Sequence, residues 1–419
     1  MLTTYAIILA VATATLVDPE RMAVGRLAGF EVTWFRLSSS VVTCTLLVDL
    51  LLHRIRTKTL LLLIRSVLLL LTFLILFLTG TIWTLFEGYV PSEALWQRYV
   101  SFISNSVLLL GLIAVLSVKP KMINVVMFLL IVSGLVTVLL ATTAVGVAWG
   151  MFETGEVIET RLRGFFDDSG YFALHMVMVL GLSLGWALWG LTRTQLAIGI
   201  LGAATAIVAI IWTGSRGALL AALVTAAAVV PVMLKKRIGR RSGPSLQVLK
   251  SLAVIGMLSG AVLYALILPL ELLDAEGYTT RLLIPTLGQT RQAIEWPFFL
   301  KAALNRPFGY GPAYWLFVQP DEVTTFMWTA HNTLLDVWLT GGPVAVLLFI
   351  GLAIRLVFKL YPIALCGDGI GVGVLAGFLG VLVAAMFLDA FSNRTTFLAT
   401  ALAAAVVYGQ RRDHNRLTV

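Results

Sequence analysis

The chain contains little charge. Only 12% of its 419 residues are Asp, Glu, Lys or Arg, 59% are hydrophobic, and the mean hydropathy is +0.96. A soluble globular protein carries about 25% charged residues. Half that share cannot cover the surface of a soluble protein of this length, and the same deficit excludes a disordered or nucleic-acid-binding chain. The composition therefore indicates an integral membrane protein.

Cysteine and histidine are also scarce, with two and four residues respectively. Cys44 and Cys366 both lie in apolar runs, which argues against a disulfide framework or a cysteine-based metal site. The acidic residues show no cluster with metal-binding spacing either. The sequence therefore predicts neither a metal nor a cofactor.

Twelve apolar segments are candidates for membrane spans, since about 20 residues cross the roughly 30 Å of hydrocarbon. They lie near residues 3–17, 35–52, 59–79, 99–118, 122–145, 169–192, 195–213, 217–234, 251–270, 332–354, 367–387 and 395–410. No basic segment precedes the first, so we interpret it as a span rather than a cleaved signal. We expect an all-α integral membrane protein with about twelve transmembrane helices, forming a single polytopic domain over residues 1–419.

The charged residues orient these spans. With the N-terminus in the cytoplasm, the basic run KKRIGRR at 235–241 is cytoplasmic, as the positive-inside rule requires. This run also accounts for much of the net charge of +9 without a polyanionic partner. All acidic residues except Asp49, Asp368 and Asp413 then fall on or near the outer side. An even number of spans places both termini in the cytoplasm.

The longest polar stretch on the outer side is 271–331, between the ninth and tenth spans. Loops of this length are usually functional or disordered. This one contains many aromatic residues: Trp296, Phe298, Phe299, Tyr310, Tyr314, Trp315, Phe317, Phe326 and Trp328. Such a composition argues against disorder and predicts a large structured loop on the outer interface, which we expect to carry the catalytic chemistry.

Two outer segments present arginines near the membrane surface. Arg216 lies in the short turn Thr213-Gly214-Ser215-Arg216-Gly217 between two apolar runs, and an ionisable residue at that depth is by default a functional candidate. The alternative is a helix end whose arginine reaches to the interface. Arg161 and Arg163 lie in 159–168 beside acidic residues, where surface ion pairs are the alternative.

Arg291 lies in the long outer loop, just before Glu295-Trp296-Pro297. Pro297 either starts a helix or kinks one already begun. We expect residues 298–305 to form a short interfacial helix. An ion pair with Glu295 is the alternative role for Arg291.

His331, followed by Asn332, stands where the long loop enters the tenth span. Imidazole is suited to proton transfer near neutral pH, so His331 is a candidate general base. The other histidines are expected to be structural, since His53 and His414 belong to cytoplasmic segments and His175 lies within a span.

Together, two or three outer arginines and a histidine indicate one kind of chemistry. Arginine matches phosphate oxygens and stays charged where the dielectric is low. Arginines at this depth could hold a lipid-linked pyrophosphate and stabilise charge on it as it leaves, while the histidine deprotonates an attacking hydroxyl. The constellation suggests glycosyl transfer from a polyprenyl-pyrophosphate sugar without a divalent ion.

Between about Arg161 and Asp336, the chain resembles the O-antigen ligase and O-antigen polymerase superfamily of bacterial envelope enzymes. Four pieces carry the resemblance: Arg161-Leu162-Arg163-Gly164-Phe165-Phe166-Asp167-Asp168, Thr213-Gly214-Ser215-Arg216-Gly217, Arg291 with Trp296 and Pro307-Phe308-Gly309-Tyr310-Gly311-Pro312, and His331-Asn332. Two details depart from the family pattern. Ser169-Gly170 stands where Pro-Asn is common, and Pro297 directly follows Trp296.

The resemblance implies a fold similar to C-type glycosyltransferases and a metal-independent, inverting transfer from an undecaprenyl-pyrophosphate-linked glycan donor. The protein would lie in the bacterial inner membrane with its active site facing the periplasm. Arg216 and Arg291 would hold the pyrophosphate and His331 would be the general base. Arg161 would be a secondary donor contact, with Arg163 and Asn332 as further substrate-binding candidates.

Three functions remain open at this point. An O-antigen ligase would move a finished glycan onto lipid A-core, and we favour it because the 271–331 loop could receive a lipid-borne acceptor from the side. An O-antigen or exopolysaccharide polymerase would instead join two lipid-linked repeat units. A transporter or flippase of an anionic glycolipid is the more distant alternative, since ionisable residues gather at one face rather than at the membrane midplane.

Overall fold

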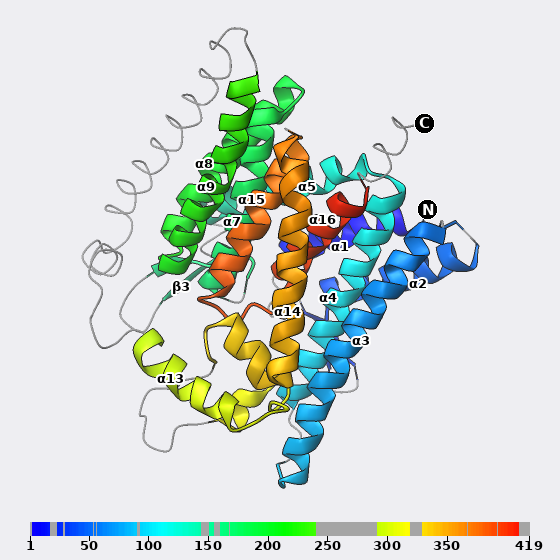
Figure 1. Ribbon diagram of the computed structural model, residues 1–419, viewed down its shortest axis with the longest axis vertical. Coiled ribbons are helices and arrows are strands. Elements are labelled where there is room, and N and C mark those ends of the chain that lie inside the picture. The colour runs from blue at the N-terminus through cyan, green and yellow to red at the C-terminus, as the bar shows by residue number, and fades with distance from the viewer. Residues whose placement is uncertain are drawn as a thin grey trace.

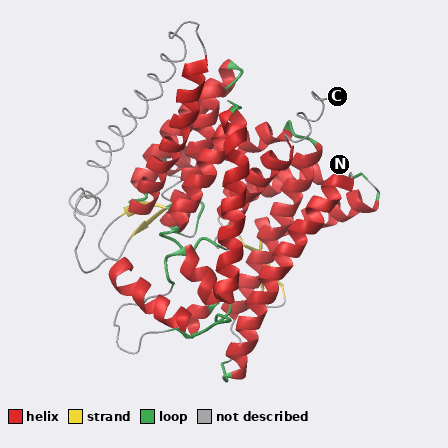
Figure 2. Cartoon of the chain, viewed as in Figure 1, coloured by secondary structure: helices red, strands yellow, loops and turns green. Residues whose placement is uncertain are grey.

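The computed structural model describes most of the chain. The described residues are 2–16, 23–27, 30–52, 54–55, 57–89, 93–143, 151–154, 160–166, 168–239, 291–318, 329–366, 368–391 and 393–409. Within them the protein is almost entirely helical, and most of the helices run roughly along one direction (Figures 1 and 2).

The described part contains twelve α-helices. They are α1 (Thr3–Leu16), α2 (Trp34–Leu51), α3 (Thr57–Phe86), α4 (Glu93–Val118), α5 (Met122–Ala141), α7 (Ser169–Trp189), α8 (Arg193–Trp212), α9 (Arg216–Gly239), α13 (Arg291–Leu304), α14 (Thr333–Leu365), α15 (Gly369–Ala385) and α16 (Arg394–Gly409). Two antiparallel hairpins were not predicted: β1 (Ala23–Leu27) with β2 (Phe30–Thr33), and β3 (Phe152–Thr154) with β4 (Thr160–Leu162).

Helices occupy eleven of the twelve predicted spans, and the segment 251–270 lies outside the described residues. Eight of the helices are long and apolar enough to cross a membrane by length and composition, and α1, α15 and α16 are shorter apolar helices. The predicted all-α fold is therefore confirmed and is consistent with a membrane protein, whereas twelve crossings stay a prediction. The short helix expected at 298–305 is longer than predicted, since α13 begins at Arg291 and contains Pro297.

Glycines allow the central helices to approach closely. A Cβ atom on Gly181 of α7 would collide with the backbone of Gly377 of α15, and one on Gly185 would lie 2.6 Å from the Cα of Gly373. Small residues give membrane helices this kind of close packing. Among the eight membrane-length helices of the described part, α7 is the most enclosed, with 94% of its apolar window buried, compared with 17% for α3.

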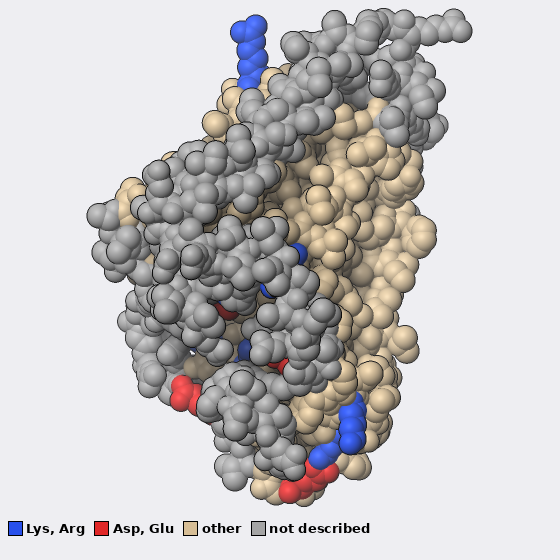
Figure 3. Space-filling view, turned by 90° about the vertical axis from the view of Figure 1, so that its left-hand side faces the viewer, with Lys and Arg blue, Asp and Glu red and all other residues tan. Residues whose placement is uncertain are grey.

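The peripheral helices expose apolar side chains instead. Large hydrophobic residues on α3 and α14, such as Leu68, Ile75, Leu347 and Phe358, are exposed. In the side view of Figure 3, one broad described area shows no charged side chain, while charges appear at both ends and in a recessed region. This distribution suits a protein surrounded by lipid.

The segment that follows α13 binds to α14 at a kink in that helix. The kink lies at Gly342, whose φ is +77°, directly before Pro343. The backbone N–H groups of Tyr310 and Gly311 donate to the carbonyl oxygens of Leu339 (2.6 Å) and Thr340 (3.1 Å) in α14. These bonds fix α13 and its following loop at the end of α14 that carries His331.

Candidate functional site

The connection between α15 and α16 lies at the centre of the site. Its described residues 386–391, which we call the α15–α16 connection, contact the first turn of α7, the start of α9, helix α13 and the segment around His331. The amide of Asn332 donates to the carbonyl of Met386 at 3.1 Å. Phe387 contacts α9 and α13, whereas Leu388 and Asp389 contact α7.

Phe387 lies between the two segments that carry Arg216 and Arg291. A Cβ on Gly217, the residue after Arg216, would lie 2.6 Å from the Phe387 Cβ, so only glycine fits there. On another side, the rings of Trp296 in α13 and Phe387 are 6.3 Å apart. The start of α9 and helix α13 therefore meet at one aromatic side chain.

Arg216 itself is the first residue of α9 and is exposed. Gly214, with φ +65°, makes the tight turn that precedes it. Arg291 is the first residue of α13, and its side chain lies outside the described part. The structure thus brings the two backbones to the same region, while the direction of the Arg291 guanidinium stays a prediction.

The Arg161–Asp168 segment leads into α7, whose first turn contacts the same connection. Arg161 lies in β4 and is partly exposed, whereas Arg163 is buried. The backbone N–H of Arg163 donates to the carbonyl oxygen of Met151 at 2.9 Å. Arg394 of α16 donates to the carbonyl of Phe165 at 2.9 Å and lies 4.4 Å above the Phe166 ring. The turn that follows Arg163 is therefore fixed from α16.

The departure at Ser169-Gly170 has a local explanation. Asp168 caps α7, and its carboxylate accepts a 2.6 Å hydrogen bond from the N–H of Gly170. A Cβ on Gly170 would lie 2.7 Å from a methyl group of Leu388. Glycine at this position lets the first turn of α7 pack directly on the α15–α16 connection.

His331 is held in an uncommon backbone conformation. Its φ is +43°, the only positive value outside glycine among the described residues. Such a conformation costs an L-residue about 1–2 kcal/mol and persists only where neighbours impose it. Here Asn332 caps α14 by accepting from the N–H groups of Leu334 and Leu335, which fixes the residue after the histidine.

The residue before the histidine is fixed by Tyr314. The N–H of Ala330 donates to the Tyr314 hydroxyl oxygen at 2.9 Å, and the Thr329 hydroxyl lies 3.5 Å from His331 Nδ1. Burial, followed by the charges of Asp336 and Asp389, raises the pKa of Tyr314 well above its ordinary value. Tyr314 is therefore neutral at any physiological pH and keeps its hydroxyl group for this contact.

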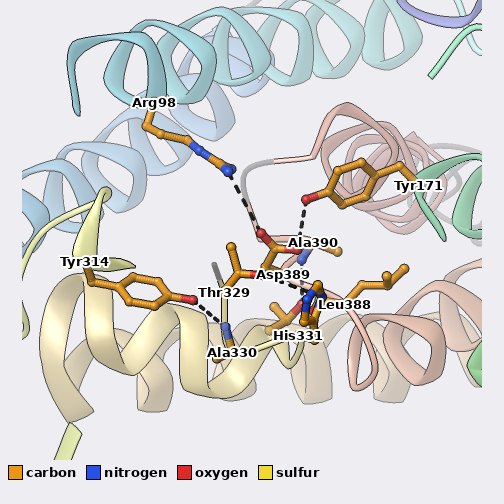
Figure 4. A network of polar contacts seen from close by, with 10 residues as sticks. Arg98, Tyr171, Tyr314, Thr329, Ala330, His331, Leu388, Asp389 and Ala390 are labelled. Atoms are coloured by element: carbon orange, nitrogen blue, oxygen red, sulfur yellow. Dashed lines mark hydrogen bonds and ion pairs between the residues drawn. The ribbon is translucent and has the colours of Figure 1, made fainter. Parts of the chain in front are cut away.

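Asp389 is buried and anchors a partly buried polar network beside the histidine (Figure 4). Its carboxylate accepts a 2.9 Å hydrogen bond from the Tyr171 hydroxyl, and Arg98 of α4 lies 3.9 Å away. Arg98 also places its guanidinium 4.6 Å from the centre of the Trp315 ring. Charged groups buried among membrane helices are usually functional and are paired with one another.

Sequence reasoning missed Arg98, Tyr171, Tyr314 and Asp389 as site residues. Asp389 carried a usable signal, since it lies in a short connection between two apolar runs, the same criterion that selected Arg216. Arg98 and Tyr171 lie within or at the start of helical segments, and their pairing with Asp389 has no local pattern. Among the described residues, no group of three His, Cys, Asp or Glu side chains could hold a metal ion.

Comparison with known families points to the same superfamily as the sequence motifs. Residues 201–350 match the family described as O-antigen ligase. The match runs from α8 into α14 and includes Arg216, Arg291, His331 and Asn332, and it confirms the resemblance to this superfamily. The Arg161–Asp168 piece of the resemblance lies outside the matched residues. A search of curated proteins found no match.

Proposed function

We propose that this multi-pass membrane protein of the O-antigen ligase and polymerase superfamily is a glycosyltransferase facing the periplasm. It would transfer a glycan from undecaprenyl pyrophosphate to a hydroxyl acceptor in the bacterial inner membrane. The observation that carries the proposal is the α15–α16 connection, which contacts the segments of Arg216, Arg291 and His331 together with the first turn of α7.

In the proposed reaction, the acceptor oxygen attacks the anomeric carbon of the donor sugar. A new C–O bond forms, the bond to the pyrophosphate oxygen breaks, and the configuration at the anomeric carbon inverts. His331 takes the acceptor proton, and undecaprenyl pyrophosphate leaves with the bonding electron pair. The hydroxyl is a weak nucleophile, so the base must lie within hydrogen-bonding reach of it.

The arginines stabilise the leaving group. Arg216 and Arg291 bind the pyrophosphate, and Arg161 and Arg163 provide further donor contacts. Fixed guanidinium groups placed where negative charge develops lower the barrier without a divalent ion. Asn332 is a substrate-binding candidate that also caps α14, so its amide cannot be altered without affecting the helix start.

We favour lipid A-core as the acceptor, which makes the protein an O-antigen ligase. Helix α13 and the loop after it rest on the end of α14. An acceptor site beside them would receive a lipid-borne acceptor from the side. A polymerase would use the same donor chemistry with a second lipid-linked glycan as acceptor.

The test is glycan transfer by purified protein supplied with a defined polyprenyl-pyrophosphate oligosaccharide, with and without lipid A-core. A discrete product that requires lipid A-core supports the ligase. A ladder formed from donor alone identifies a polymerase. No product with either, together with movement of labelled donor between leaflets of proteoliposomes, would replace the enzyme with a transporter.

A further inference from the structure

Arg98 touches two parts of the protein that are far apart in sequence. Its guanidinium lies 3.9 Å from the Asp389 carboxylate and 4.6 Å from the Trp315 ring. Asp389 belongs to the α15–α16 connection, and Trp315 belongs to the short 3₁₀ helix Tyr314–Leu316 after α13. We propose that Arg98 is a positioning residue for His331, acting through both partners. This inference rests on the proposed function, in which His331 is the general base.

The first chain of contacts leads from Arg98 through Asp389 to the residues after His331. Asp389 lies between Leu388 and Ala390, and both backbones bind Thr333. The Thr333 hydroxyl donates to the carbonyl of Leu388 at 2.7 Å and accepts from the N–H of Ala390 at 2.9 Å. Because Thr333 is the first residue of α14, fixing Asp389 fixes the start of that helix.

The second chain of contacts leads from Arg98 through Trp315 to the residues before His331. The rings of Trp315 and Tyr314 are 5.5 Å apart and nearly perpendicular. The Tyr314 hydroxyl accepts the hydrogen bond from Ala330, and its ring packs against Phe299 of α13 at 5.9 Å. Holding Trp315 therefore also holds the segment that leads into the histidine.

His331 lies between the residues that these two chains of contacts hold, and its backbone is in the left-handed conformation. Without restraint from both sides, the chain would relax to the more common backbone regions and carry the imidazole with it. A general base displaced by about 1 Å can lose about a hundredfold in rate. Arg98 is suited to both contacts because a planar guanidinium can pair with a carboxylate and stack on an indole.

The experiment compares Arg98→Gln, Arg98→Lys and the control Arg65→Gln, which removes an exposed arginine on α3. We expect Arg98→Gln to lower kcat at least about tenfold with less than about a threefold change in the KM for donor, the pattern of lost transition-state geometry. Arg98→Lys keeps the charge but not the planar group, so its kcat should lie between those of Arg98→Gln and the wild type. Arg65→Gln should match the wild type.

A double variant tests the route through Asp389. If Arg98 acts through the carboxylate, Arg98→Gln combined with Asp389→Asn should lower kcat no further than the more severe single variant. If the factors by which the two single substitutions lower kcat instead multiply in the double variant, Arg98 does not act through Asp389. If the Arg98→Gln protein cannot be obtained in folded form, the Arg98→Lys variant provides the test. A kcat of Arg98→Lys equal to that of the wild type would then overturn the inference.

His331→Ala, assayed in parallel, separates this inference from the proposed function. A normal rate for His331→Ala contradicts the general base itself. A lost rate for His331→Ala with an unchanged kcat for Arg98→Gln contradicts only the positioning role.

Discussion

The N–H of Tyr310 donates a 2.6 Å hydrogen bond to the carbonyl oxygen of Leu339. Leu339 lies four residues before Pro343, which has no N–H to offer that carbonyl. The loop after α13 therefore supplies the donor that the proline removes from α14. A polar backbone group at a helix kink in a membrane protein must be satisfied in this way, so the kink and the loop are one structural unit.

This unit makes a prediction about Gly342. Its φ of +77° and its contact with the Pro307 carbonyl leave no room for a Cβ. We expect Gly342→Ala to destabilise the protein by at least about 1–2 kcal/mol, seen as a lower unfolding temperature in detergent. Gly351→Ala in the same helix meets no atom within 4 Å and serves as the matched control. Equal unfolding temperatures for the two variants would contradict the account of the kink.

The contact between α7 and α15 predicts a second stability effect. Gly181→Ala would place a methyl group in the backbone of Gly377 and force the two helices apart. We expect a marked loss of folded protein after extraction, measured by gel filtration, because membrane helices depend on such close approach. Gly409→Ala, where nothing lies within 4 Å, should extract normally.

The ion pair between Glu87 and Arg306 predicts a pH effect. The hydrogen bond from Arg306, together with its charge, lowers the pKa of Glu87 from its ordinary value of 4.5. A carboxyl with a lowered pKa stabilises the folded state above pH 4.5, and this contribution is lost as the pH falls through the folded-state value. Glu87→Gln should therefore unfold at a slightly lower temperature than the wild type at pH 7, with the difference shrinking on acidification. A difference that grew at low pH would contradict the assignment.

The helices and the outer arginine segments could be predicted from sequence because hydropathy and charge act locally. Long apolar runs mark spans, and Arg216 is conspicuous because its turn is too short to leave the interface. The helix expected at 298–305 is too short, because α13 begins at Arg291 and contains Pro297, which is the second of the two alternatives that the proline left open. Trp296 before the proline and Phe299 after it both pack against other parts of the protein.

The network around Asp389 could not be predicted in the same way. Arg98 and Tyr171 lie on different helices, and only tertiary packing brings them to one carboxylate. The same holds for the left-handed backbone of His331, which depends on Tyr314 and Asn332 on either side. The candidate base and Asn332 were identifiable from their place in the chain, whereas Arg98, Tyr171 and Tyr314 became apparent only from tertiary contacts.

The arginines make a prediction about turnover. Arg216→Ala and Arg291→Ala should each lower the rate of glycan transfer at least about tenfold while the protein still inserts and folds, because each removes a charge that stabilises the leaving pyrophosphate. Near-normal turnover of Arg216→Ala would remove that residue from the mechanism. The exposed Arg65 provides the matched control, as Arg65→Ala.

The same mechanism predicts that chelation has no effect. Transfer should continue in excess EDTA, because guanidinium groups take the place of a divalent ion at the pyrophosphate. The measurement is the initial rate with and without chelator at constant ionic strength. Loss of activity that Mg²⁺ restores would contradict the role given to the arginines.

The most direct test of the central claim is glycan transfer by His331→Ala, with His414→Ala as the control from the C-terminal segment. Both purified proteins would receive a defined polyprenyl-pyrophosphate oligosaccharide and lipid A-core, and their unfolding temperatures would be compared. We expect His331→Ala to fold normally, bind donor and transfer almost no glycan, while His414→Ala transfers at the wild-type rate. Wild-type transfer by a folded His331→Ala protein would contradict the assignment of the general base.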